Sequence, residues 1–189
     1  MALTANGTQA RFPTTALRQA NPPLAAGPLA FTTDADHKSF MVTGPDDRFD
    51  LNRFVQAQEE VYPRALAELK QGRKRSHWMW FIFPQIDGLG YSSTAKFYAI
   101  KSKDEAKAYL EHPLLGKRLM ECAEALLKIE GKSAAEIFGY PDDLKLRSSM
   151  TLFASASAAD SVFSRVLDQY FEGEPDQSTI EILQQRGSI

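Results

Sequence analysis

The chain has 189 residues, of which 43% are hydrophobic and 24% charged, the composition of an ordinary globular protein. Its formal net charge of -2 at pH 7 gives no overall attraction for nucleic acid or for an anionic membrane. The single cysteine, Cys122, excludes an internal disulfide and a cysteine-rich zinc site. No apolar run reaches the roughly 18 residues of a membrane-spanning helix, so we expect a soluble, cytoplasmic protein.

Residues 1–45 are predicted to be a disordered N-terminal tail. They hold five of the ten prolines, few large apolar residues and no hydrophobic periodicity, so they cannot offset the entropy cost of ordering. The first acidic residue is Asp34, a bias shared with organelle transit peptides, although a plain flexible extension is the simpler interpretation. Residues 46–189 are predicted to form a single domain.

Helical patterns follow one another from residue 46 onward. Asp50 is expected to cap a helix that continues to Leu69, with Pro63 at the start of a second segment. Ser102 and Ser133 open capping boxes, in which a serine is followed three residues later by a glutamate. The cleanest amphipathic stripe predicts a helix that ends before a glycine, with these apolar positions: Leu115, Leu119, Cys122, Leu126 and Ile129.

Three more helices are expected in the C-terminal part. One begins at Asp142 or Asp143, the next ends at Gly173, and Ser178 offers a cap for the last. No hairpin turn joins alternating strands, and no internal repeat of 20 to 50 residues is present. The sequence therefore predicts an all-α fold, a single compact domain of about seven helices.

The stretch 72–90 combines cations, aromatic rings and glycines. Residues 78–83 are consecutively apolar, which fits a buried strand or a buried helical turn, and aromatic propensity alone favours the strand. In the simplest interpretation four rings form the hydrophobic centre: Trp78, Trp80, Phe81 and Phe83. Cations beside aromatic faces also suit an anionic ligand with a planar ring, and three cations and a histidine precede the run: Arg73, Lys74, Arg75 and His77.

A glycine loop with hydroxyls follows the aromatic run. Gly88 and Gly90 permit a close backbone approach, and the hydroxyl residues after them lead into a helical pattern that includes Tyr98. A helix N-terminus lined by hydroxyls is suited to an anion, so phosphate is expected to dock there. The dinucleotide fingerprint fails because Ser93 stands at its third glycine position. A P-loop before Lys132 fails because Leu126 stands at its first glycine position. Neither nucleotide motif is therefore present.

Other catalytic motifs are also missing from the sequence. The histidines show no metal-ligand spacing, so we predict no metal site, and no hydrolase nucleophile elbow occurs. One predicted helix brings a lysine close to three hydroxyls: Lys145, Ser148, Ser149 and Thr151. We interpret them as a second phosphate-binding patch. An exposed lysine among polar residues is the simpler alternative, and a Lys-Ser nucleophilic pair is a third.

Several segments within residues 49–185 carry a resemblance: GRKRSHWMWFIFPQIDGLG at 72–90, HPLLGKRL at 112–119, IFGYPDDLK at 137–145, SSMTLF at 148–153, and residues 176–183. They resemble a widespread family of small proteins of unknown function that is often labelled calpastatin. The residues give no physical reason for that label. The resemblance implies a compact, mostly helical fold in which the aromatic run is not part of a sheet, and it implies no activity and no catalytic residues.

A fainter similarity is to NADAR proteins, small helical domains of which some hydrolyse the N-glycosidic link to an ADP-ribosyl group. This similarity rests on size, helical class and scattered apolar, acidic and lysine positions. It implies a ligand with phosphates and rings, the same class that the cations and aromatic residues of the chain suit. A dinucleotide would offer phosphates to Arg73, Lys74 and Lys145, and rings to Trp78, Trp80 and Tyr98.

We therefore predict binding of a phosphate-bearing small molecule, a nucleotide or ADP-ribose-like ligand, with N-glycosidic hydrolysis as an enzymatic form and no cofactor. The expected ligand-binding residues are Arg73, Lys74, Trp78, Trp80, Gln85, Gly88, Gly90, Tyr98, Lys145, Ser148, Ser149 and Thr151. For hydrolysis, His77 would handle the proton, and one carboxylate would face the sugar: Asp142, Asp143 or Asp176. The alternatives are a helical module that binds a protein partner through tryptophan and arginine, and a structural core with solvated cations.

Overall fold

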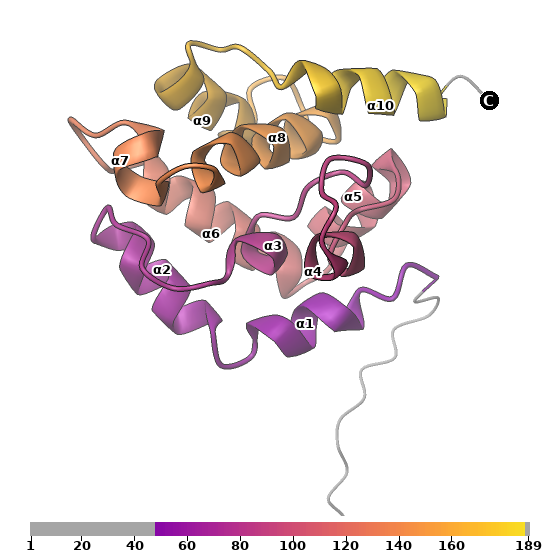
Figure 1. Cartoon of the computed structure of the whole chain (residues 1–189), viewed down its shortest axis with the longest axis horizontal. Helices are drawn as coiled ribbons and strands as arrows, with labels where there is room; N and C mark the ends of the chain where they lie inside the picture. Colours follow the sequence, from indigo (N-terminus) through magenta and orange to yellow (C-terminus); the bar gives the residue numbers. More distant parts are fainter. Residues whose placement is uncertain (1–47, 188–189) are drawn as a thin grey trace, which may run out of the picture. The chain divides into compact units, whose positions relative to one another are not determined.

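A computed structural model of the chain describes residues 48–187, so the predicted tail over residues 1–45 lies outside the described part. The described residues form ten helices and one isolated parallel bridge, between Ile86 and Ile100 (Figure 1). The predicted all-α class and single helical domain are confirmed. The helices outnumber the expected seven because those of one or two turns have too few residues to show a period.

The helices have the following bounds in chain order: α1 Asn52–Gln58, α2 Tyr62–Lys70, α3 Met79–Ile82, α4 Ser93–Phe97, α5 Lys103–Glu111, α6 Leu115–Leu127, α7 Ala134–Phe138, α8 Asp142–Ser155, α9 Val162–Phe171 and α10 Gln177–Gly187.

Serine caps begin four of these helices. Each serine hydroxyl accepts a hydrogen bond from the backbone N–H three residues later, at Ser92, Ser102, Ser133 and Ser161. The capping box at Ser133 is confirmed, with both of its hydrogen bonds formed. The expected caps at Asp50 and Ser178 are wrong. Leu51 precedes α1, and α10 is capped by Asp176, whose carboxylate accepts from the Thr179 N–H at 2.9 Å.

Helices α6 and α8 hold the core together. Helix α8 packs against α5, α7, α9 and α10, while α6 packs against α2, α5 and α9 (Figure 1). The ring of Phe153 on α8 lies 5.4 Å from Tyr109 and 5.7 Å from Phe163, measured between centroids. Cys122 of α6 is fully buried, and burial raises the pKa of its thiol to about 12, as expected for a core thiol rather than a nucleophile.

The aromatic run does not form a strand. Met79–Ile82 is a single helical turn, α3, which packs against α1. The preference for an extended run is therefore wrong for these residues, because packing against α1 overrides aromatic strand propensity. After Phe83 the chain extends, and the Ile100 N–H donates to the Gln85 carbonyl at 2.9 Å. This short pairing fixes the glycine loop and α4 beside α3.

Candidate functional site

The two tryptophans of the aromatic run lie in different surroundings. Trp78 is fully buried, and its indole N–H donates to the Glu68 carboxylate at 2.8 Å. Trp80 is half-buried at the surface. Since Trp78 is enclosed and its only donor is already paired, it belongs to the core.

Glu68 of α2 holds the segment that leads into α3. Its carboxylate accepts from the Arg75 N–H at 2.8 Å, the Ser76 N–H at 3.0 Å and the Ser76 hydroxyl at 2.6 Å, and the Arg64 guanidinium lies 3.2 Å away. Burial alone would raise the pKa of Glu68, but these hydrogen bonds outweigh it and lower the pKa to about 2. We call Glu68 and these partners, with Trp78, the Glu68 centre.

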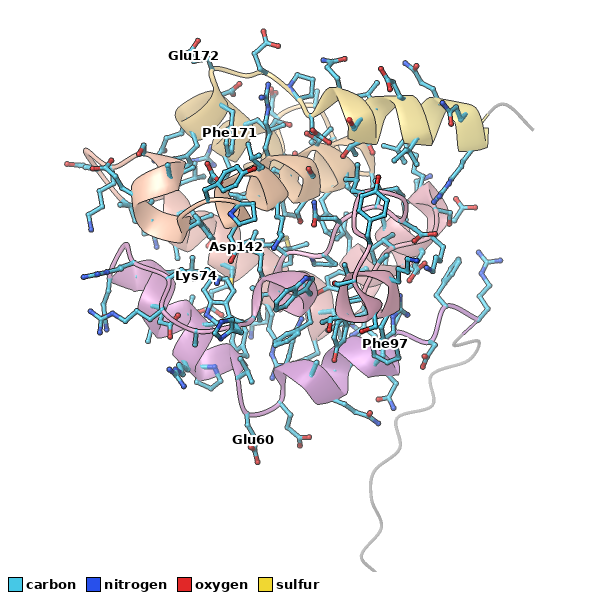
Figure 2. The ribbon with its side chains drawn as sticks, in the orientation of Figure 1. Glu60, Lys74, Phe97, Asp142, Phe171 and Glu172 are labelled. Atoms are coloured by element: carbon cyan, nitrogen blue, oxygen red, sulfur yellow. The ribbon has the colours of Figure 1, made fainter. Side chains whose placement is uncertain are left out.

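The Asp142 centre consists of Asp142, Lys74 and Lys145. The Lys74 ammonium lies 2.7 Å from one carboxylate oxygen of Asp142 (Figure 2). The Lys145 ammonium lies 2.7 Å from the other oxygen. The exposed fractions of the three side chains are 17% for Asp142, 9% for Lys74 and 24% for Lys145. Burial alone would raise the pKa of Asp142, but the two lysines outweigh it and hold this pKa below its usual value.

Each lysine of the Asp142 centre also lies over a tryptophan. The Lys74 nitrogen is 5.2 Å from the centroid of the Trp78 ring, and the Lys145 nitrogen is 5.0 Å from that of Trp80. The structure therefore brings together two of the predicted cations with both predicted tryptophans. The other two cations of the run, Arg73 and Arg75, have exposed side chains.

An aromatic groove lies between α3 and α4. It is an open, shallow hollow of about 570 Å³, lined by His77, Trp80, Phe81, Ser93, Thr94, Phe97 and Tyr98. The centroid of the Tyr98 ring lies 5.4 Å from that of Phe81 and 4.8 Å from that of Phe97, so these three rings form one continuous wall of the groove. Trp80 joins the groove to the Asp142 centre, because its ring lines the first and lies under the Lys145 ammonium of the second.

The three predicted hydroxyls of α8 do not form one patch. Ser148 donates to the Leu144 carbonyl at 3.1 Å. Thr151 donates to the Arg147 carbonyl and accepts from the Asp176 N–H, both at 2.8 Å, so it ties α8 to the start of α10. Ser149 is fully buried, and its hydroxyl has no partner among the described residues. The first two hydroxyls therefore serve the fold.

The predicted glycine loop packs against other parts of the fold. A Cβ at Gly88 would lie 3.2 Å from Ile182 of α10, and a Cβ at Gly90 would lie 2.5 Å from that of Ala95 in α4. Gly88 also has a φ of +110°, which side chains rarely adopt. Gln85 is half-buried and takes part in the fold through its backbone carbonyl. Packing thus accounts for both glycines without a ligand.

The four residues expected in hydrolysis occupy separate places. His77 lines the aromatic groove, whereas both oxygens of Asp142 are held by lysines. Asp143 has one buried oxygen without a partner within the described residues, and Asp176 caps α10. Among the described residues, no hydrogen bond or ion pair joins His77 to any of these carboxylates. The structure therefore does not bring the four expected hydrolysis residues together in one place.

Comparisons with known proteins fit this helical fold. Residues 48–183 match DUF1810, a family described as a protein of unknown function. The chain belongs to this family. It is also similar to a solved structure, the conserved hypothetical protein Rv1873 from Mycobacterium tuberculosis, with 54% identity, 73% of this chain and 99% of that chain covered, and a TM-score of 0.72. A search of curated proteins gives no match. Neither finding supports the label calpastatin or a relation to NADAR proteins.

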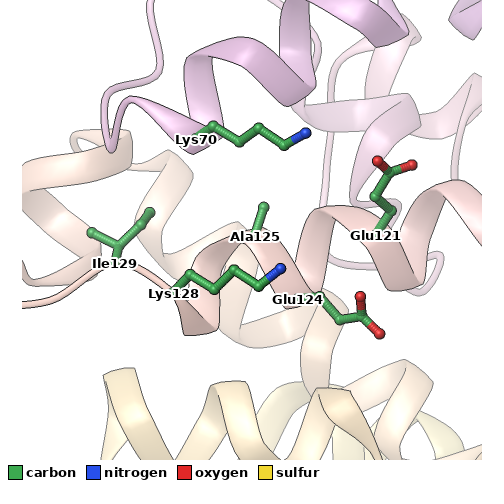
Figure 3. A pocket seen from close by; sticks show the side chains of 6 residues that line it. All are labelled: Lys70, Glu121, Glu124, Ala125, Lys128 and Ile129. Atoms are coloured by element: carbon green, nitrogen blue, oxygen red, sulfur yellow. The ribbon is translucent and has the colours of Figure 1, made fainter.

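The DUF1810 fold has a second hollow, between α2 and α6. It encloses about 360 Å³ and is lined by Lys70, Glu121, Glu124, Ala125, Lys128 and Ile129. Figure 3 shows Lys70 on the α2 side and the other residues on the α6 side. Two lysines and two glutamates leave it without net charge, and it contains no aromatic ring. This hollow therefore lacks the features expected for an anionic ligand with a planar ring.

The described residues contain neither a candidate metal site nor a candidate membrane-spanning helix. No cluster of three or more histidine, cysteine, aspartate or glutamate side chains there is placed to hold a metal ion. None of the described helices is both long and apolar enough to cross a bilayer.

Sequence reasoning missed some residues of the aromatic groove and of the Glu68 centre. Phe97 lines the groove although nothing in the sequence singled it out, and Ser93 and Thr94, which were expected only as hydroxyls at a helix start where phosphate docks, line it too. Glu68 was not singled out, yet it supplies the partner that the Trp78 indole requires. The available signal was chemical, since a buried tryptophan needs an acceptor. The sequence does not reveal which carboxylate is that acceptor, because Glu68 lies in another helix.

Proposed function

We propose that the chain binds a small molecule with a planar ring and an anionic group, a nucleotide or an ADP-ribose-like compound, in the aromatic groove. The observation that carries the proposal is the position of Trp80, which lines the groove and lies under the Lys145 ammonium 5.0 Å away. One side chain thus joins an aromatic surface to a fixed cation. Such a ligand needs both.

The size and lining of the groove support this proposal. Its volume of about 570 Å³ falls within the usual range of small-molecule sites, roughly 300–1,000 Å³. Four rings supply stacking surface, and the polar groups of His77, Ser93 and Thr94 supply hydrogen bonds to orient a sugar. The Asp142 centre supplies cationic charge beside it.

Thermal unfolding of the full chain with adenosine, AMP, NAD and ADP-ribose tests the proposal. A ligand at a hundred times its dissociation constant adds about 2.7 kcal/mol to the free energy of unfolding, which raises the midpoint by several degrees. Isothermal titration then gives the affinity. A flat response to every compound would contradict the proposal.

Two variants locate the site. Phe97 is 56% exposed, so Phe97→Ala should fold normally while losing affinity, and Trp80→Ala should weaken binding by about tenfold or more through lost stacking. Met120→Ala is the matched control, because Met120 is 42% exposed on α6 and does not line the groove. Equal affinities for all three variants would place the ligand elsewhere.

N-glycosidic hydrolysis stays a prediction about the same groove. His77 is suitably placed to handle a proton, but the Asp142 oxygens are both held by lysines, so a carboxylate at the sugar would require one lysine to move. Chromatography of NAD and ADP-ribose after incubation with the chain tests this directly. Release of nicotinamide from NAD, or of adenine from ADP-ribose, that is lost in His77→Ala would support it, and no release of either base would contradict it.

Exposed rings favour a protein partner as the second candidate. Tyr91 is 87% exposed and Phe97 is 56% exposed at the ends of the segment that forms the groove wall. Aromatic residues of this kind dominate the energetics of protein interfaces. A Tyr91→Ala variant separates the candidates, because Tyr91 does not line the groove. Loss of a partner without loss of nucleotide binding would favour the interface.

A further inference from the structure

We propose that the Asp142 centre selects a singly charged anion, so that the preferred ligand is a nucleoside phosphodiester rather than a phosphomonoester. This inference rests on the function proposed above and names the ligand class of the same site. It follows from the charge of three side chains and from how deeply they are buried.

The charge of the Asp142 centre is the first step. Two ammonium groups, on Lys74 and Lys145, share the single carboxylate of Asp142, so the three groups together carry one positive charge. A singly charged anion neutralises this charge. A bound dianion would leave one negative charge of the ligand without compensation. The side chains around it are only 9% to 24% exposed, so this charge would lose much of its hydration, which disfavours binding of the dianion.

Hydrogen-bond capacity is the second step. An ammonium group has three N–H donors, and Asp142 is the one hydrogen-bonding acceptor that each lysine has within residues 48–187. Each lysine therefore keeps two donors for a phosphate oxygen or for water. A phosphodiester has two unsubstituted oxygens that share one charge, which suits two ammonium groups.

The lack of further cations is the third step. Arg73 and Arg75 are exposed on the segment before α3, and Arg147 of α8 is engaged elsewhere, since its guanidinium donates to the Glu174 carbonyl at 2.9 Å. Arg147 also projects about 160° away from Lys145 around the helix axis, at 100° per residue. Within the described residues the cation count of the centre is therefore two.

The test compares three adenine nucleosides and nucleotides that carry different phosphate charges. They are adenosine, which is neutral, 3′,5′-cyclic AMP, which is singly charged, and AMP, which at pH 8 is doubly charged because its second pKa is about 6. Isothermal titration of the full chain at pH 8 should give tighter binding for the cyclic nucleotide than for either adenosine or AMP.

Asp142→Asn changes the charge of the centre from one to two. The ratio of AMP affinity to cyclic AMP affinity should then rise by about tenfold, because AMP gains an additional favourable charge interaction. Glu124→Gln is the matched control, since it makes the same change in net charge at the hollow between α2 and α6 and should leave the ratio unchanged (Figure 3). Lys145→Met makes the centre neutral and should bring cyclic AMP down to the affinity of adenosine.

The possible failures are distinguishable. If adenosine binds but AMP binds as tightly as cyclic AMP in the wild type, or the ratio does not move in Asp142→Asn, charge selection is wrong while the groove function stands. If none of the three compounds binds, and NAD and ADP-ribose do not bind either, the proposed function itself fails. Should Asp142→Asn not fold, as judged by circular dichroism, the Lys145→Met result decides alone, and an unchanged preference for cyclic AMP would overturn the inference.

Discussion

The Glu68 centre and the Asp142 centre each place a carboxylate near a tryptophan, but the two carboxylates have different kinds of partner. Glu68 accepts from two backbone N–H groups, a hydroxyl and an indole, all fixed by the fold. Asp142 contacts the ends of two lysine side chains, which can move and keep unused donors. The difference indicates that the first centre holds the chain in place, whereas the second has charge and hydrogen bonds to offer a ligand.

The surroundings of the tryptophans follow the same division. Trp78 is fully buried against Phe83 and Phe138, with ring centroids 6.2 Å away in both cases. Trp80 borders the groove. Substitutions in the Glu68 centre should therefore lower stability, while those in the Asp142 centre should change binding. The predictions below test the stability half of this comparison, in order of expected size.

Glu68→Ala should give the largest loss. It removes the acceptor of the Trp78 indole and of the Arg75 and Ser76 N–H groups, and a buried donor without a partner costs about 1–3 kcal/mol. We expect the free energy of unfolding to fall by about 3–4 kcal/mol, measured by urea denaturation. Glu60→Ala, at an exposed glutamate (Figure 2), should change it by less than about 0.5 kcal/mol. Similar small losses in both variants would show that the Glu68 centre is not the structural one.

Acid should remove the contribution of Glu68 in a defined pH range. The pKa of this carboxyl is lowered from 4.5 to about 2 in the folded chain, so its stabilisation is complete above pH 4.5 and is lost as the pH falls toward 2. A shift of this size corresponds to about 3 kcal/mol.

Urea denaturation of the wild type and of Glu68→Gln between pH 7 and pH 2 measures this contribution. The glutamine variant lacks the titrating group, so the difference between the two proteins should shrink as the pH falls below 4.5. Glu60→Gln serves as the control and should follow the wild type. A difference that stays constant down to pH 2 would mean that the Glu68 hydrogen bonds do not depend on its charge.

The sequence predicts the fold well where local signals suffice. The stripe of α6 and the box at Ser133 were readable because helical spacing and capping involve residues within a few positions of each other. The four-residue helix α3 was not, since its conformation depends on packing against α1, which lies some twenty residues earlier.

The site was predicted only in part, for a similar reason. Residue type alone pointed to Lys74, Lys145 and Trp80, because cations and rings are recognisable in any sequence. Asp142 pairs with Lys145 three positions later and with Lys74 in a distant segment before α3, and no local pattern encodes the longer contact. Trp78 and Thr151 were assigned to the ligand because sequence does not reveal that their polar groups already have partners.

Ser149→Ala should produce the smallest effect, and it should have the opposite sign. Ser149 is fully buried on α8, within about 60° of Asp142 and Lys145 around the helix axis, and its hydroxyl has no partner in the described part of the chain. Removing an unpaired buried hydroxyl relieves its desolvation cost, and alanine favours a helix, so stability should rise by up to about 1 kcal/mol. Thr151→Val is the matched contrast on the same helix, because it leaves the Asp176 N–H without its acceptor and should cost about 1–2 kcal/mol. A clear loss of stability in Ser149→Ala would mean that the Asp142 side of α8 is itself built for stability, and the division between the two centres would no longer hold.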